Sequence, residues 1–179
     1  MILPPLIWTF FAVIGIVIAY VLVVFVLTHS VVPNYGWKKT PLPHGISDQL
    51  LREIESLAKM YRTPDMFLRA AFELISKRYP VKSRIGVIRH PFSVFVKSPE
   101  KLWNMHGSYL HCHQMNLLLR IFLVKSNLFK DEHIEPHYSI LNLFTHQYLH
   151  VKVDDDTLFI DPWAFKFRVP FGKFAQGWM

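Results

Sequence analysis

The chain has 179 residues, of which 51% are hydrophobic and 18% are charged, and its formal net charge is +7. Intrinsic disorder is excluded, because a chain this apolar can bury enough surface to offset its conformational entropy. The counts of 7 Gly, 12 Pro and a single Cys also exclude the collagen-like, low-complexity and disulfide-rich classes.

The apolar excess is concentrated near the start of the sequence. From Leu6 to Leu27 no residue is charged, and at 1.5 Å per residue this segment makes a helix of about 33 Å, enough to cross a bilayer core of about 30 Å. A cleaved signal peptide, the competing interpretation, normally has a basic start and a shorter apolar stretch. We therefore predict a single-pass membrane anchor over residues 1–32, in contact with membrane lipid through Leu6–Leu27.

The residues after this segment indicate its orientation. Lys38 and Lys39 follow it and no Lys or Arg precedes it, so the positive-inside rule predicts a cytoplasmic C-terminal domain. Tyr35 and Trp37 are aromatic residues of the kind found at membrane interfaces. The single cysteine fits a reducing compartment without requiring one.

Three prolines and two glycines make residues 33–45 a short, stiff linker. The remaining residues, 46–179, are then one domain. Its first predicted helix has Ser47 as N-cap and runs to about Met60, with apolar residues at helical spacing.

A second predicted helix begins with Thr63 as N-cap and Pro64 at its first position, and it must end before Pro80. A basic stretch from Lys77 to Arg89 follows. It is either a solvated loop or a contact with anionic lipid headgroups. No nucleic-acid-binding motif accompanies this charge, so we expect no nucleic acid partner.

The middle of the domain is expected to be largely helical. Phe92 to Val96 is predicted as a short strand or an extended connector. Ser98 and Pro99 have the residue types of a helix start, N-cap and first position. The apolar stretch from Met115 to Val124 predicts a buried helix, and Cys112 lies just before it or in its first turn.

The last third of the sequence changes to an alternating pattern. From His146 to Val153 apolar and polar residues alternate, which predicts a half-buried strand. Residues 154–157 are a turn, and the segment from Leu158 to Asp161 is a returning strand that Pro162 stops.

The single cysteine is the candidate nucleophile. A thiol becomes strongly nucleophilic when a helix N-terminus and a nearby imidazole lower its pKa. Cys112 meets the first condition if its helix forms as predicted.

The predicted hairpin can supply a base and a group that orients it. A two-residue turn at 154–155 places Asp161 opposite Tyr148 and diagonal to His146, within reach of a hydrogen bond. A turn one residue later places Asp161 opposite His150 instead. Either register leaves one histidine on the face that carries the carboxylate, so nucleophile, base and orienting group are all present.

Taken together, these segments resemble the transglutaminase-like superfamily. The core motif of that family is a Cys at a helix start, a His-x-aromatic pattern on a strand and an Asp-Pro on the next strand. Cys112, His146 with Tyr148, and Asp161 before a proline match it, over about residues 65–163. The match in spacing favours His146 over His150 as the base.

The resemblance implies an α+β fold, a papain-like domain in which helices pack on an antiparallel sheet. It also implies a membrane-anchored cysteine enzyme that acts on amide bonds of a protein or peptide substrate through a thioester, by acyl transfer or hydrolysis. The roles it implies are Cys112 as nucleophile, His146 as general acid and base, and Asp161 as the residue orienting the imidazole. No cofactor and no metal are implied, and the oligomeric state stays open.

Some positions depart from the family pattern. His111 and His113 flank the cysteine, where the family often has small or acidic residues, and Tyr148 stands where Trp is more common. The backbone N–H of Cys112 is one candidate donor to an oxyanion. The further candidates for the oxyanion site or the cleft are His106, Gln114, Tyr148 and His150.

Two other interpretations remain. One is a catalytically inactive papain-like module that binds a protein partner at the membrane. The other is a metal site, although the spacing is not that of a zinc finger. The candidate ligands would be His106, His111, Cys112, His113, His146 and His150.

The tail from Trp163 to Met179 is aromatic and basic. It is either a final strand that packs on the sheet or a second contact with the bilayer interface, where aromatic and cationic side chains are favoured.

Overall fold

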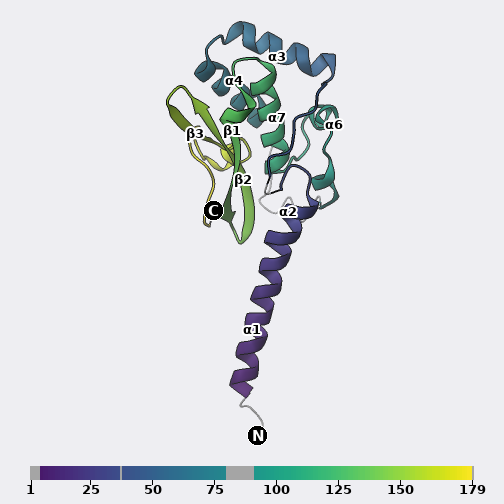
Figure 1. The fold of residues 1–179 in the computed structure, drawn as a ribbon, viewed down its shortest axis with the longest axis vertical. Coiled ribbons are helices and arrows are strands. Elements are labelled where there is room, and N and C mark those ends of the chain that lie inside the picture. Colours follow the sequence, from purple (N-terminus) through teal and green to yellow (C-terminus); the bar gives the residue numbers. More distant parts are fainter. Residues whose placement is uncertain (1–4, 37, 80–90, 179) are drawn as a thin grey trace.

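A computed structural model describes residues 5–36, 38–79 and 91–178 of the chain (Figure 1). A long apolar helix leads into an α+β domain, in which helices pack against a small antiparallel sheet. Most of the basic stretch from Lys77 to Arg89, interpreted as a solvated loop or a lipid contact, falls in residues 80–90, which lie outside the described residues.

The N-terminal helix is continuous from α1 (Pro5–Val21) through the wider turns of η1 (Leu22–Leu27) to α2 (Thr28–Val31). The 25 residues of Ile7–Val31 are long and apolar enough to cross a membrane, and their side chains are almost entirely outside the core of the domain. The predicted apolar helix is thus confirmed, and it continues four residues past Leu27.

The helix starts predicted from caps and prolines are confirmed. In α3 (Asp48–Met60), Ser47 Oγ accepts a hydrogen bond from the backbone N–H of Leu50. In α6 (Pro99–Asn104), Ser98 Oγ accepts one from the N–H of Lys101, and a proline occupies the first helical position. A proline also begins α4 (Pro64–Arg78), where the side chain of the N-cap residue Thr63 makes no capping hydrogen bond. Proline suits the first position of a helix, because the backbone N–H at that position has no intrahelical partner and proline has no N–H to leave unbonded.

The segment expected to be a strand or connector before α6 is instead a 3₁₀ turn, η2 (Pro91–Phe95). Two side chains from the next long helix hold it. His113 contacts the carbonyl of Val94, and Gln114 donates to the carbonyl of Ser93. Because these carbonyls have side-chain partners, the segment does not need a neighbouring strand to satisfy them.

The domain is organised around α7 (Cys112–Lys125). This helix contacts strand β2 and the helices α3, α4 and α6. Every side chain from His113 to Leu123 is buried, as expected for a helix with neighbours on all sides. The predicted buried helix is therefore confirmed, and Cys112 is its first residue.

Within the described residues, the sheet has the strand order β1–β2–β3, and both pairs are antiparallel. Strands β2 (Phe144–Val153) and β3 (Asp156–Ile160) form the predicted hairpin. Strand β1 (Ile134–Leu141), which follows the short turn η3 (Asp131–His133), was not predicted.

The tail packs on the sheet, but not as the final strand that the sequence suggested. It forms the short turn η4 (Ala164–Phe167) and later a single parallel bridge between Leu141 and Gly177. The ring of Phe174 stacks on Tyr148 with centroids 4.0 Å apart. Aromatic stacking and backbone hydrogen bonds of Gly177 with Ile140 and Asn142 hold this segment in place.

Candidate active site

Cys112 is placed by the start of α7. His111 is the N-cap residue, and its backbone N–H donates to Gln114 Oε1 at 3.0 Å. The cysteine side chain is half-buried and forms no disulfide. The backbone N–H groups at the first positions of a helix lack intrahelical partners, so the thiol lies at the end of the helix that favours negative charge.

His146 and Asp161 meet where β2 extends beyond β3. The pairing of the two strands ends at Leu149 and Ile160, in the register that follows from a turn at 154–155. The alternative register, with Asp161 opposite His150, is wrong. Asp161 is the first residue after β3, and its Oδ2 lies 2.6 Å from His146 Nε2.

The carboxylate of Asp161 is fixed by the tail as well as by the histidine. Its Oδ1 accepts a hydrogen bond from the backbone N–H of Ala164 at 3.1 Å, and its Oδ2 accepts one from the N–H of Ala175 at 3.0 Å. Both Asp161 and His146 are buried. A buried carboxylate held at both oxygens fixes the orientation of the imidazole bonded to it.

The charges around His146 favour its protonated form. Burial lowers the pKa of His146. The charge of Asp161, then that of Cys112, and hydrogen-bond contributions from both residues raise the pKa by more than burial lowers it. The pKa of His146 is therefore raised to about 10. Cys112 is therefore a neighbour of the imidazole. Because Nε2 is bonded to the carboxylate, the other ring nitrogen, Nδ1, is the one left for the sulfur.

Three tyrosines also surround the cysteine. Burial, and next the charge of Cys112, raise the pKa of Tyr35. Burial is the largest cause at the other two as well: it raises the pKa of Tyr109 to about 12 and raises that of Tyr138, with Cys112 contributing in the same direction. All three hydroxyls are consequently protonated at neutral pH.

Tyr35 reaches the site from the linker, although its position in the sequence suggested a membrane interface. It is 5% exposed, and its ring centroid lies 5.3 Å from Tyr138 and 5.5 Å from His113. His29, at the end of the apolar helix, packs against both tyrosines, at 5.1 Å from Tyr35 and 4.7 Å from Tyr138. The end of the apolar helix is thereby connected to the surroundings of Cys112.

Two of the residues suggested for the oxyanion site or the cleft, Gln114 and His106, have other surroundings. The Gln114 amide donates to the carbonyls of Ser93 and Val96, at 2.7 and 3.0 Å, so it supports η2. His106 is exposed in the turn after α6.

The other two, Tyr148 and His150, share the face of β2 that carries His146. Burial and the charge of Asp161 raise the pKa of Tyr148, which lies nearer the site. His150 is further along the strand and stacks on His137 with centroids 3.4 Å apart; burial and then His137 lower its pKa.

The histidines on either side of Cys112 point into the protein. His113 is buried and contacts the carbonyl of Val94; burial, and next the neighbouring His111, lower the pKa of His113 to about 3. His111 pairs with Ser93 Oγ at 3.0 Å. Within the described part of the chain, no three His, Cys, Asp or Glu side chains are grouped so that they could hold a metal ion.

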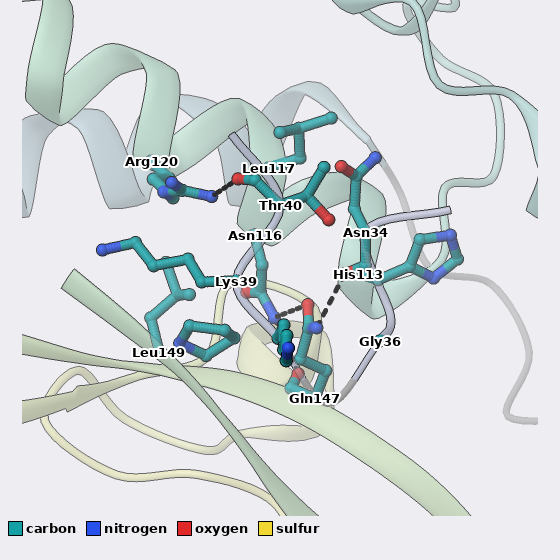
Figure 2. A pocket seen from close by; sticks show the side chains of 12 residues that line it. Asn34, Gly36, Lys39, Thr40, His113, Asn116, Leu117, Arg120, Gln147 and Leu149 are labelled. Atoms are coloured by element: carbon teal, nitrogen blue, oxygen red, sulfur yellow. Dashed lines mark hydrogen bonds between the residues drawn. The ribbon is translucent and has the colours of Figure 1, made fainter. Parts of the chain in front are cut away.

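A pocket lies on the opposite face of β2, between the linker and α7 (Figure 2). Gln147, which faces it, donates to the carbonyl of Asn34, and Asn116 donates to the carbonyl of Gln147. Arg120 donates to the carbonyl of Thr40. Because successive side chains of a strand point to opposite faces, this pocket is separate from His146, and its polar groups attach the linker to the domain.

The sequence patterns identified Cys112, His146 and Asp161 but not the tyrosines around the thiol. Tyr35 and Tyr138 belong to the linker and to the unpredicted strand β1, so no local signal connected them with the cysteine. Tyr109, three residues before Cys112 in the sequence, could have been found by its proximity.

Comparison with family models, curated proteins and solved structures finds no match to this chain.

Proposed function

We propose that the protein is a membrane-anchored cysteine enzyme of the transglutaminase-like type, which cleaves amide bonds through a thioester. The observation that carries the proposal is the arrangement around one buried imidazole. Asp161 lies 2.6 Å from His146 Nε2, and Cys112, at the start of a helix, is near enough to the same ring for its charge to raise the pKa of His146. This arrangement supports the proposal, because acyl transfer needs a nucleophile, a base and an orienting group close together.

In the first step, the sulfur of Cys112 attacks the carbonyl carbon of the substrate amide and forms the C–S bond. His146 holds the proton that leaves the thiol and gives it to the amine nitrogen as the C–N bond breaks. The acyl group is then a thioester on Cys112, and the amine leaves. Asp161 stabilises the imidazolium that exists between these two proton transfers.

In the second step, water or a primary amine attacks the thioester carbon. His146 takes a proton from this nucleophile, the C–S bond breaks, and the proton returns to the sulfur. Water gives hydrolysis and an amine gives transfer. The same three side chains serve both outcomes, so we assign the reaction class and leave the acceptor open.

The negative charge that develops on the carbonyl oxygen needs hydrogen-bond donors. The backbone N–H of Cys112, at the first position of α7, is one donor. The Tyr35 hydroxyl is our second candidate: it lies near enough to Cys112 for the charge of the cysteine to raise the pKa of Tyr35, and Thr145 is its hydrogen-bond partner. Tyr138 is less suitable, because its hydroxyl already donates to the carbonyl of Gly36 and accepts from Gln147.

The membrane part of the proposal rests on the helix Ile7–Val31, which is long and apolar enough to cross a bilayer. We assign the domain to the cytoplasmic side, because Lys38 and Lys39 follow this helix. The substrate would then be a protein or peptide within reach of a membrane-bound domain.

The test uses the full chain in detergent and the activated ester p-nitrophenyl acetate, which reports acylation without knowledge of the natural substrate. We expect a burst of nitrophenolate, an acetyl group on Cys112 detected by mass spectrometry, and slower turnover. Cys112→Ser should lose the burst. An acetyl group on another residue, or an unchanged burst in Cys112→Ser, would contradict the proposal and leave the inactive binding module as the better interpretation.

A further inference from the structure

A group of exposed apolar side chains lies at the turn between β1 and β2. Ile140 and Leu143 are more than half exposed, and Phe144 is nearly half exposed. Trp178, which is 78% exposed, is held beside them, because the adjacent Gly177 forms a bridge with Leu141 and donates its N–H to the carbonyl of Ile140. These four residues are called the hairpin tip below. Contiguous exposed apolar surface of this kind marks an interaction site.

The hairpin tip lies beside the apolar helix. Strand β2, which begins at Phe144, contacts η1 (Leu22–Leu27), and Val24 of that segment is buried. In Figure 1 the lower end of the sheet, with the C-terminus next to it, points in the direction in which α1 leaves the domain. The tip therefore continues the apolar surface of the helix.

The level of this contact can be compared with the thickness of a bilayer. Val24 precedes the end of the span, Val31, by seven residues, which is about 10 Å along a helix. Elements that lie in a membrane interface bury their apolar face by about 5–10 Å. A hairpin that contacts η1 thus reaches the boundary between the lipid headgroups and the acyl chains, where apolar side chains are buried.

The backbone of the turn adds an independent observation. Asn142 and Leu143 both have positive φ, 49° and 69°. Two-residue hairpin turns of this type favour Asn-Gly, because a side chain such as that of Leu is strained in the left-handed region. An exposed leucine at a position that favours glycine indicates that the leucine side chain serves an interaction with something other than the rest of this domain.

We propose that the hairpin tip is inserted into the lipid leaflet nearer the domain, beside the N-terminal helix. The domain is then held on the bilayer at two places. His146 follows Phe144 by two strand residues, about 7 Å. Cys112 and His146 are thereby held near the bilayer surface, where a membrane-resident acyl donor would meet them. This last consequence rests on the proposed function, whereas the docking itself does not.

The test is a measurement of depth on the full chain in nanodiscs made of phosphatidylcholine and phosphatidylglycerol. In a Cys112→Ser background, a single cysteine replaces Leu143 and carries a nitroxide label. Collisions of the label with oxygen, which concentrates in lipid, and with a water-soluble nickel chelate give its depth. Labels at Val17 in the helix and at Lys152, exposed at the far end of β2, are the lipid and water references.

We expect the label at Leu143 to be protected from nickel like that at Val17, and the label at Lys152 to be accessible. Nickel accessibility at Leu143 equal to that at Lys152 would overturn the proposal, and so would an accessible label at Val17. Because a change in the turn could alter its fold, Trp178→Cys gives the same measurement from outside the turn. None of these outcomes depends on enzymatic activity, so they are separate from the test of the proposed function.

Discussion

His146 Nε2 lies 2.6 Å from Asp161 Oδ2 in the buried part of the sheet, and two backbone N–H groups hold the same carboxylate. The pair connects the beginning of β2, the residue after β3 and the tail. A histidine fixed in this way has one ring nitrogen committed to the carboxylate and the other available for the thiol of Cys112. The chemistry proposed for the cysteine depends on this relationship.

Replacement of Asp161 by Asn should remove the charge while keeping the size of the side chain. The amide cannot stabilise the imidazolium, so we expect turnover of p-nitrophenyl acetate to fall by about 10²–10⁴-fold, the usual contribution of an acid–base group. Asp155→Asn, a change at an exposed position of the β2–β3 turn, is the matched control. Equal rates in the two variants would contradict the orienting role.

The raised pKa of His146 predicts a pH-dependent contribution to stability. Because its pKa rises from 6.5 in the unfolded chain to about 10 in the fold, the stabilisation is complete below about pH 6.5 and is lost as the pH rises through about 10. The difference in melting temperature between the unmodified protein and His146→Gln should therefore shrink as the pH rises from 6.5 to 10.

His106→Gln, at an exposed position, serves as the control for this pH series, and its difference from the unmodified protein should stay constant. Melting can be followed by circular dichroism in detergent. A difference for His146→Gln that grows with pH would show that the neutral imidazole, not the imidazolium, is the form favoured by the fold.

Gln114 should act on stability more than on chemistry. Its amide donates to the carbonyls of Ser93 and Val96 and accepts from the N–H of His111. Each buried partner left without a hydrogen bond costs about 1–3 kcal/mol, so Gln114→Ala should lower the free energy of unfolding by at least that amount. Gln114→Glu keeps the acceptor but turns a carboxylate oxygen toward the two carbonyls, so it should lose at least as much. The measurement is urea unfolding; an unchanged unfolding curve for both variants would contradict this role.

The hydroxyl of Tyr35 should matter more for acylation than for folding. Phe fills the same space between His29, Tyr138 and His113. It loses the hydrogen bond with Thr145, so Tyr35→Phe should lower the free energy of unfolding by about 1 kcal/mol. The rate of the nitrophenolate burst should fall by about 10²-fold, as when one oxyanion donor is removed. In Tyr138→Phe, where the hydroxyl is bonded elsewhere, a smaller effect is expected. An unaltered burst in Tyr35→Phe would exclude it as a donor.

Much of the local structure was predictable because single residues determine it. Ser47 and Ser98 cap helices with their own side chains, and a proline follows Thr63 where a helix can begin. Val153 and Asp156 pair across a short turn, as one of the two considered registers requires. In this register Asp161 meets His146, whereas strand spacing alone left His150 as an alternative and only the family resemblance favoured His146.

The elements that sequence patterns missed depend on distant partners. Strand β1 contains Pro136 and an irregular pattern of burial, and it is identified only by its pairing with β2. The turn η2 is held by His113 and Gln114 of α7. Tyr35 is buried because the linker folds back along the domain. Such contacts are decided by tertiary packing, which local periodicity does not encode.

The central claim is that His146 activates Cys112, and the alkylation rate of this thiol tests it most directly. Cys112 is the single cysteine of the chain, so iodoacetamide labelling of the full-length protein near neutral pH reports on it alone. We predict that the unmodified protein reacts at least about tenfold faster than His146→Ala, because a neighbouring imidazolium favours the thiolate of a cysteine. Equal alkylation rates in the two folded proteins would contradict the account.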